Sequence, residues 1–471
     1  MATTPISSPK TILVTGDASI DWFQTVLPPD PAASDRNWMM QPRILRQPLP
    51  GGVFLLADLC ERATGGKVSR PLLKESPDAI PYGAMVTTEV ELERAGDAKD
   101  RLQVRGYPGY AFAPEGASGR SQVDFPVDAS EAKVVVIDDA GNGFRDEPAR
   151  FPKGIKPGSC IVHLQCRPLG SGSLWSEWMH GEAGRACGSN RVLVVDGEDL
   201  RRAGEVSLSR ALSWERTALE FTGQLQSNPI LKGLARCPNL VVLLGTDGAL
   251  WFRDGKPART LLYFDPGRLE GGFAGEFTPK GPGIRMAFTA FIAARLAREG
   301  ITGLGEGIRD GLWAARKVSL LGLDFKDHTI SHRFATLDSD SIRSPIESQQ
   351  GKKPVHSEFA EVEVPMEAAL GATSVPHWTI LEEKTRARRI EIAREIVLRG
   401  NHKAMGEVPD IRFGPFLNSF DRREIEAFSS IRNLLSEYLR PSKPGSAPAP
   451  FNIAVFGSPG SGKSFGVKQI A

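Results

Sequence analysis

The feature that most constrains this chain is a series of short, uninterrupted runs of branched apolar residues. Three of them read VVVI at 134–137, VLVV at 192–195 and VVLL at 241–244. A strand without a polar side must be covered on both faces, as in a parallel sheet flanked by helices. Helical patterns separate several of the runs, which indicates an α/β fold with a doubly wound, mainly parallel sheet. We predict strands at 11–15, 133–137, 160–164, 191–195 and 240–244, and helices at 53–62, 209–225, 284–298 and 308–320.

Length and composition narrow the class of protein. The 471 residues exceed what one small core needs, so more than one domain is expected. With 41% hydrophobic and 24% charged residues the chain is typical of soluble globular proteins, and its net charge of +2 gives no argument for a nucleic-acid or membrane partner. Five cysteines without a CxxC pair argue against a disulfide-built secreted domain. We find no signal peptide and no membrane-length apolar run, which indicates a cytoplasmic protein.

The second half of the chain has a different character. Residues 326–440 show weak periodicity apart from helical spacing at 381–398 and 421–439, where Asp421 is a candidate N-cap. The Pro-rich stretch at 441–450 is typical of a semi-rigid linker. We therefore predict a domain at 1–325, an irregular and helical connector at 326–440, the linker, and the start of another domain at 451–471.

A phosphate-binding motif stands at the end of the chain. An apolar run at 451–456 predicts a strand, and it leads into GSPGSGKS, which fits the P-loop pattern GxxxxGK[ST]. Glycines allow such a loop to point its N–H groups at phosphates, while Lys463 would contact the β- and γ-phosphates and Ser464 would bind Mg²⁺. ATP and Mg²⁺ are thus expected at Gly457, Ser458, Pro459, Gly460, Ser461, Gly462, Lys463 and Ser464.

The motif resembles the P-loop of AAA+ and related ATPases, over about 20 residues. Residues 465–471 leave no room for a Walker-B acid, a water-positioning residue or an arginine finger. We therefore expect a truncated P-loop NTPase domain. ATP hydrolysis would need the full-length protein, and the absent part would be the route to a homo-oligomer.

The order of segments over about 310 residues resembles the ribokinase-like, or PfkB, carbohydrate kinase family. ILVTGDASID is similar to that family's first strand, Gly51-Gly52 to its glycine pair, and VVVIDDAGNGF to a strand that ends in an acid near the phosphates. VVLLGTDGALWFRDG is similar to its strand-turn-strand beside the nucleotide, and GPGIRMAFTAFIAARLARE stands where the family has its GxGD motif.

The chain departs from that family at the catalytic position. The GxGD aspartate accepts the proton of the sugar hydroxyl, but here the sequence is Gly281-Pro282-Gly283-Ile284. Isoleucine cannot accept a proton, and the neighbouring Arg285 cannot act as a base because its pKa exceeds about 12. The catalytic residue is therefore unassigned. The departure favours loss of phosphoryl transfer over relocation of the base.

Polar residues at the strand ends are candidate ligand contacts. A crevice outside the carboxyl ends of parallel strands would bring them together. Each acid beside a glycine also fits ordinary turn chemistry, so both interpretations stay open. The candidates are Asp17, Asp21, Asp138, Asp139, Asn142, Asp247, Gly281, Gly283 and Arg285.

Two other residue groups favour structural roles. Cys160, His163 and Cys166 do not share one face of a strand, so they do not predict a metal site. Trp175, Trp178 and Met179 favour the core of an amphipathic turn over an exposed partner patch.

These features predict an ATP-binding multidomain protein. Its kinase-like domain would be a catalytically inactive ligand sensor or assembly module for a C-terminal P-loop ATPase. Its partners would be a nucleotide and a small-molecule ligand, with neither membrane nor nucleic acid indicated. Two alternatives remain: an active carbohydrate or nucleoside kinase with Asp139 or Asp247 as an unusual base, and a non-enzymatic scaffold.

Overall fold

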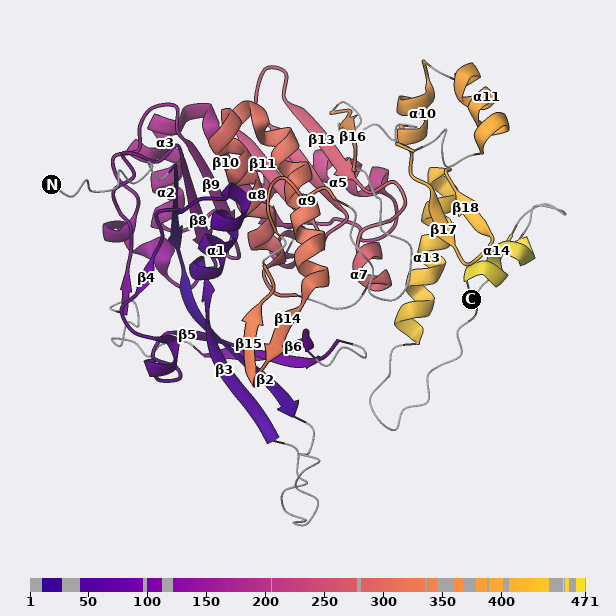
Figure 1. Cartoon of the computed structure of the whole chain (residues 1–471). Coiled ribbons are helices and arrows are strands. Elements are labelled where there is room, and N and C mark those ends of the chain that lie inside the picture. Colours follow the sequence, from indigo (N-terminus) through magenta and orange to yellow (C-terminus); the bar gives the residue numbers. More distant parts are fainter. Residues whose placement is uncertain are drawn as a thin grey trace, which may run out of the picture.

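A computed structural model gives the architecture of the chain (Figure 1). It describes residues 11–27, 43–95, 100–111, 122–204, 206–277, 281–334, 337–344, 359–366, 378–387, 389–400, 406–439, 452, 454–456 and 463–470. None of the helices in these ranges is both long and apolar enough to cross a membrane.

An eight-stranded sheet forms the centre of the molecule, in the order β1-β8-β9-β10-β11-β12-β13-β16. The first five of these strands are parallel neighbours and the last three pair antiparallel, which confirms the predicted mainly parallel sheet. All five predicted strands exist within one or two residues of their expected bounds. The strands are β1 (Ile12–Gly16), β8 (Val134–Asp139), β9 (Cys160–Gln165), β10 (Arg191–Asp196), β11 (Asn239–Leu244), β12 (Gly248–Arg253), β13 (Arg259–Phe264) and β16 (Ala360–Val364).

Helices cover both faces of this sheet, as the unbroken apolar runs require (Figure 1). One face packs on α1 (Val53–Thr64), α8 (Ile284–Glu299) and α9 (Leu304–Leu321). The other face packs on α2 (Ser173–His180), α4 (Gly197–Arg202), α5 (Trp214–Ser227) and α6 (Pro229–Leu234). Two shorter helices, α3 (Glu182–Cys187) and α7 (Gly272–Glu276), complete this part. Trp178 is buried in the second layer, which confirms the predicted core role of that turn.

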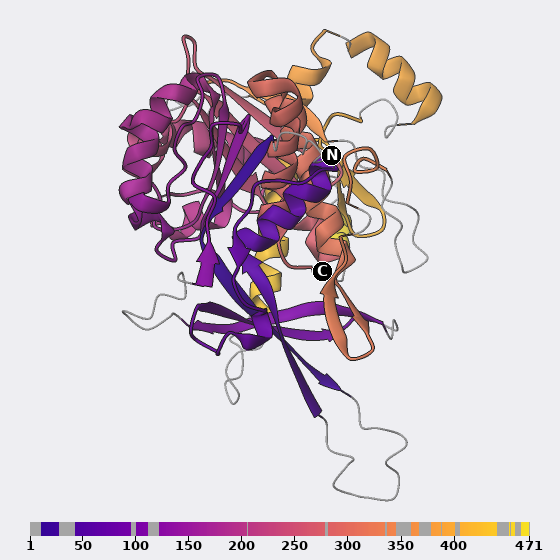
Figure 2. The same cartoon turned by 60° about the vertical axis from the view of Figure 1, so that its left-hand side comes forward.

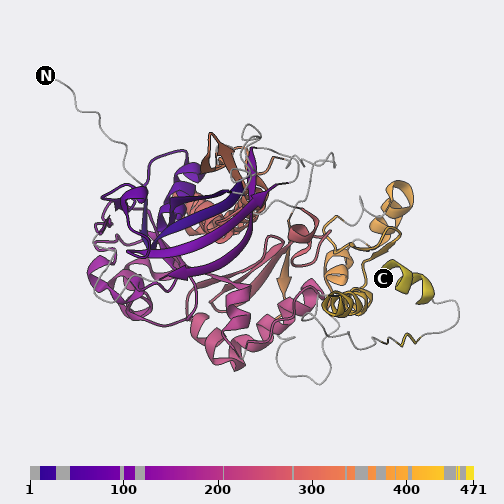
Figure 3. The same cartoon turned by 90° about the horizontal axis from the view of Figure 1, so that it is seen from below.

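A second, six-stranded sheet lies below the large one (Figure 2). Its order is β15-β14-β6-β5-β2-β3, and its strands curve markedly in the view from below (Figure 3). The strands are β2 (Ala18–Leu27), β3 (Arg43–Gly52), β5 (Val86–Arg94), β6 (Arg101–Ala111), β14 (Leu323–Lys326) and β15 (Thr329–His332). Two short strands, β4 (Leu72–Leu73) and β7 (Val123–Asp124), form a separate antiparallel pair.

The predicted domain boundary at 325 is wrong. The β14–β15 hairpin belongs to the second sheet, and β16 forms the edge of the large sheet by pairing with β13. Local periodicity could not show this, because both contacts join residues far apart in the sequence. Within the described part of the chain, the predicted connector supplies strands of both sheets.

Part of the rest of the predicted connector packs on the α/β core, through Ile380, Ile411 and Ile425, whereas Ile392 belongs to a small separate cluster. The expected helix at 381–398 is divided into α10 (Ile380–Thr385) and α11 (Arg389–Arg399). α13 (Arg422–Tyr438) is confirmed, and the Asp421 carboxylate caps it by accepting bonds from Arg423 N at 2.9 Å and Glu424 N at 3.1 Å. Between them lies the hairpin of β17 (Ile411–Phe413) and β18 (Leu417–Ser419).

Residues 457–462 of the predicted P-loop and the linker at 441–450 lie outside the described residues. The expected strand at 451–456 is not found where the structure describes it, since residues 452 and 454–456 belong to no strand and are exposed. Phe456 is 92% exposed, so this segment has no sheet to cover its apolar side chains. Helix α14 (Lys463–Ile470) begins at the predicted lysine. It contacts the β17–β18 hairpin, where Phe416 N donates to Gln469 Oε1 at 3.0 Å.

Candidate functional site

A group of polar residues gathers at the carboxyl ends of the first four parallel strands. This edge is where open α/β sheets place their ligand crevice, because the loops after parallel strands diverge there. The second sheet begins at the same edge, since β2 follows β1 after a single residue, Asp17. Asp138 is the penultimate residue of β8, Cys166 follows β9 and Asp196 ends β10.

Arg285 is a cation of this group, and Arg167, whose Nε lies 3.4 Å from Asp199 Oδ1, is another. Arg285 lies in the first turn of α8, and its Nη1 donates to Asp199 Oδ2 at 2.9 Å. Cys166, when ionised, and the carboxylates Asp196, Asp199 and Asp138 raise the pKa of Arg285. Sequence reasoning named Arg285 but missed Asp199, although an acid three residues after an apolar strand carries the same signal as the other candidates.

Asp138 is buried with one unpartnered oxygen. Its side chain shares a strand face with Val134 and Val136, the face that packs on α1 and α8. Burial, and then the negative charge of Asp17, raise the pKa of Asp138 to about 8, with Arg285 acting in the opposite direction. The carboxyl group is therefore protonated at neutral pH and can donate a hydrogen bond. Its Oδ2 has no hydrogen-bond partner among the described residues.

Asp21 faces the same region from β2. Its carboxylate accepts a bond from Ser19 Oγ at 3.2 Å, and burial raises the pKa of Asp21 to about 6. A side chain on the adjacent Gly51 would overlap this carboxylate, so the glycine pair makes room for Asp21. The negative charge of Asp21 contributes to the raised pKa of Asp138.

Asp17 organises the loop after β8. Its carboxylate accepts bonds from Asn142 N at 3.0 Å and Phe144 N at 2.9 Å. This agrees with the turn interpretation of Asp17, and it explains why Asn142 lies close to the strand ends.

Asp139 lies on the opposite face of β8 from Asp138. Its side chain is fully buried, with Arg145 Nε at 2.8 Å and His163 Nε2 at 3.0 Å. Burial alone would raise the pKa of Asp139, but His163 and Arg145 outweigh it and lower that pKa. The carboxylate is thus ionised, and its bonds to Arg145 and His163 join β8 to the segment that follows it and to β9. His163 serves this network, and among the described residues no cluster of His, Cys, Asp or Glu could hold a metal ion.

Asp247 lies in a second buried network. Its carboxylate accepts bonds from Gly271 N at 2.8 Å, Phe273 N at 3.2 Å and Arg316 Nη2 at 3.0 Å. The Arg316 guanidinium also donates to Asp265 at 2.6 Å and lies 4.4–4.5 Å from the centres of the Phe273 and Phe359 rings. Burial raises the pKa of Asp247 to about 6 despite Arg316. Arg316 has no sequence signal beyond its place in an amphipathic helix.

The glycine loop before α8 is fixed by close packing. A side chain on Gly281 would overlap the Val318 carbonyl oxygen of α9, and Gly283 has a φ of +87°. Ile284 is the first residue of α8, and no side chain caps that end of the helix. The position expected to hold a catalytic base therefore holds an apolar side chain beside the Arg285–Asp199 ion pair.

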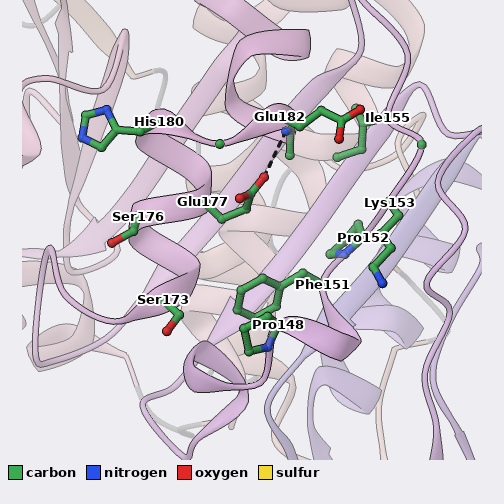
Figure 4. Close-up of a pocket in the computed structure, with 13 residues that line it drawn as sticks. Pro148, Phe151, Pro152, Lys153, Ile155, Ser173, Ser176, Glu177, His180 and Glu182 are labelled. Atoms are coloured by element: carbon green, nitrogen blue, oxygen red, sulfur yellow. Dashed lines mark hydrogen bonds between the residues drawn. The ribbon is translucent and has the colours of Figure 1, made fainter.

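A cavity lies away from these residues, beside α2. A pocket of ≈ 710 Å³ opens beside α2, lined by Phe151, Lys153, Glu177 and His180 among others (Figure 4). Glu177 is held by a bond from Ala183 N at 3.3 Å. None of the residues predicted from the sequence lines this pocket.

Comparisons with known proteins add the following. No protein-family model matches the chain, and no curated protein sequence matches it either. Solved structures that match include fructokinase with bound ATP from Xylella fastidiosa, at 15% identity over 71% of this chain and 97% of that one, with a TM-score of 0.38. Fructokinase from Vibrio cholerae O395 matches at 16% identity over 71% and 98%, with a TM-score of 0.37.

A nucleoside kinase from Methanocaldococcus jannaschii, described as an archaeal member of the ribokinase family, matches at 10% identity over 71% and 97%, with a TM-score of 0.35. TM-scores below 0.5 do not establish a shared fold. The α/β architecture depends instead on the strand order and registers described above.

Proposed function

We propose that the α/β part of this chain binds a small polyhydroxylated ligand, a sugar or a nucleoside, at the carboxyl edge of its large sheet without phosphorylating it. One observation carries the proposal. Where the family resemblance expects a proton acceptor, the chain has Ile284, and the adjacent Arg285 is already paired with Asp199.

Asp21 suits a ligand rich in hydroxyls, whereas Asp138 is buried and its Oδ2, unpartnered among the described residues, is not accessible. Asp21, with its pKa near 6, is mostly ionised at pH 7 and can accept bonds from hydroxyl groups.

The two unusual bases considered for an active kinase are both committed to buried ion pairs. Asp139 is fully buried and bonded by Arg145 and His163. Asp247 is fully buried and bonded by Arg316 and two backbone amides. Neither carboxylate can reach a ligand hydroxyl without breaking its network, and general base catalysis requires hydrogen-bond contact with the proton removed.

The C-terminal motif completes the proposal. Residues 457–464 would hold ATP and Mg²⁺, with Lys463 on the phosphates and Ser464 on the metal. α14 contacts the β17–β18 hairpin, whose Phe413 packs in the same apolar cluster as the large sheet. These contacts would let ligand occupancy in the α/β part influence nucleotide binding at the C-terminal motif, so the α/β part would act as a sensor or assembly module.

Calorimetric titration with unphosphorylated sugars and nucleosides tests this function. We expect saturable binding by the wild-type chain, weakened about tenfold or more by Asp21→Asn, because an ionised acceptor of hydroxyl bonds is lost. Asp78→Asn, at an exposed position, is the matched control and should bind as wild type does. Incubation of the same panel with ATP and Mg²⁺ should yield no phosphorylated product. Absence of binding across the panel, or product that disappears in Asp139→Asn or Asp247→Asn, would overturn the proposal.

A further inference from the structure

The pocket beside α2 is separate from the carboxyl edge of the large sheet (Figure 4). Its walls come from the segment 148–155, from α2 and from the turn that leads into α3, and the described residues that line it include none of those at the carboxyl edge. Its volume of ≈ 710 Å³ is typical of small-molecule sites, which measure about 300–1,000 Å³. Such sites combine apolar walls with a few placed polar groups, so the nature of the lining indicates the ligand.

Apolar side chains form one part of the lining. Phe151 is only 5% exposed, and its ring centre lies 5.7 Å from that of Phe144. Because Phe151 belongs to the buried cluster of the second helical layer, the protein core fixes its position before any ligand arrives. Pro148, Pro152 and Ile155 add apolar surface beside it. This part of the pocket is therefore preformed and suits an apolar group.

Glu177 of α2 is a carboxylate held in one position. Its Oε1 accepts a bond from Ala183 N at 3.3 Å. A side chain at Gly181 would lie 2.0 Å from the Glu177 carboxyl group, so the glycine leaves room for that group in the turn after α2. Among the described residues, Glu177 has no cationic partner and its Oε2 has no hydrogen-bond donor. The second oxygen is thus available to a ligand that donates a bond.

Lys153 supplies the opposite charge from the facing segment. Figure 4 shows Glu177 on the side of α2 and Lys153 across the pocket from it. Within the described ranges, the Lys153 ammonium group has neither an ion pair nor a hydrogen bond. His180 and Glu182 also line the pocket, but they belong to α2 and to the start of α3, on the same side as Glu177. The pocket therefore has an acceptor carboxylate and an ammonium donor on different walls.

This lining is complementary to a zwitterion that carries an apolar side chain. The ammonium group of an α-amino acid would donate to Glu177, its carboxylate would accept a bond from Lys153, and its side chain would lie on Phe151. Hydrogen bonds between ionised partners are about twice as strong as those between neutral groups. An uncharged sugar would leave both charges without a counter-ion, and a phosphorylated ligand would bring anionic oxygens close to Glu177.

We propose that the pocket beside α2 binds a free α-amino acid with an apolar side chain. This site goes beyond the proposed function, since it uses different residues and a different part of the molecule. Binding at the carboxyl edge and binding in the pocket can therefore fail independently.

Calorimetric titration with L-leucine, L-phenylalanine and L-tryptophan tests the ligand class. We expect saturable binding of at least one of them, and binding about tenfold or more weaker for glycine, which has no side chain to bury on the apolar wall. The amide and the N-acetyl derivative of the best ligand should each bind about tenfold or more weakly than the amino acid, because each lacks one of its two charges.

Two variants assign the charges to their partners. Lys153→Met should bind the amino acid about tenfold more weakly and should no longer distinguish it from its amide. Glu177→Gln can still accept the bond from Ala183 N, but it should no longer distinguish the amino acid from its N-acetyl derivative. Lys156→Met and Glu131→Gln are the matched controls, because these two residues pair with each other at 3.1 Å and do not line the pocket.

The possible results divide clearly. No saturable binding of any of the three amino acids, or unchanged binding by either pocket variant, would overturn the proposal. Weakening by only one of the two derivatives would show a simple anion or cation site and would overturn it as well. Equal weakening in the control variants would have the same consequence, since it would place the effect outside the pocket. Thermal unfolding of each variant checks that the chain is folded.

Discussion

At the scale of single residues, two neighbouring aspartates have opposite chemistry. Asp138 and Asp139 are consecutive in β8, so their side chains point to opposite faces of the sheet. Asp139 meets Arg145 and His163, which lower its pKa, whereas Asp138 meets apolar residues and Asp17, which raise its pKa to about 8. The same residue type is a structural anion on one face and a neutral hydrogen-bond donor on the other.

The raised pKa of Asp138 predicts a pH-dependent stability. Between its ordinary value of 3.8 and about 8, the folded state keeps a proton that the unfolded state releases, so the free energy of unfolding falls as pH rises. Asp138→Asn keeps the neutral shape and does not titrate. The variant should therefore gain stability relative to wild type between pH 5 and pH 8, by at most about 1.4 kcal/mol per pH unit.

Urea unfolding of both proteins at pH 5, 6.5 and 8 measures this difference. Asp124→Asn is the control, because Asp124 has a 70% exposed side chain and its variant should follow the wild-type profile. Parallel profiles for wild type and Asp138→Asn would show that Asp138 is not protonated in the folded protein.

At the scale of elements, the sequence pattern of the loop before α8 fits more than one role, and its packing shows one of them. The sequence places two glycines before a helix, which fits an anion-binding loop as well as a simple helix start. The structure shows that Gly281 also serves packing, because its Cα lies against the Val318 carbonyl of α9. The helix pair α8–α9 therefore fixes the position of Ile284 and Arg285 over the strand ends.

Gly281→Ala should destabilise the protein by about 1–3 kcal/mol, the usual cost of forcing an extra methyl group into a packed site. Gly275 is the matched control, since it lies in α7 with no atom within 4 Å of the position its Cβ would occupy. Gly275→Ala should be neutral or stabilise by up to about 1 kcal/mol, because alanine is the better helix former. Chemical unfolding measures both, and equal effects of the two substitutions would contradict the packing role of Gly281.

At the scale of the whole molecule, the C-terminal part is an extension of the α/β core. Ile380, Ile411, Phe413 and Ile425 belong to the same buried cluster as the second helical layer. Polar contacts add to this, since Ser213 Oγ donates to Glu426 at 2.8 Å and Ile380 N donates to Glu215 at 3.1 Å. Residues 378–439, where described, should therefore unfold together with the large sheet.

Phe413→Ala tests this cooperativity. Removal of a buried phenylalanine should lower the free energy of unfolding by about 3–5 kcal/mol. If the chain unfolds as one unit, calorimetry should show a single transition at a lower temperature than in wild type. Phe416, in the same hairpin, is 78% exposed, so Phe416→Ala should change stability by no more than about 0.5 kcal/mol. A separate early transition that moves alone in Phe413→Ala, with the main transition unchanged, would show two independent units.

The sequence by itself determined the elements whose signal is local. Apolar runs predicted the five parallel strands, helical spacing predicted α1, α8, α9 and α13, and the Asp421 cap was readable from residue type and position. The absence of a base at position 284 also needed only the sequence. These features depend on the side chains of neighbouring residues, which local patterns record directly.

Tertiary structure alone decided which polar residues share a site and which are structural. It joined β14, β15 and β16 to the two sheets, paired Arg285 with Asp199, and enclosed Asp139 and Asp247 in ion pairs with Arg145 and Arg316. Most of these contacts join segments that are separated in the sequence by other elements of the fold. The contact of Asp139 depends instead on the face of β8 to which its side chain points. The role of a charged residue is decided by its partners and its burial, and both are set only when the distant segments pack together.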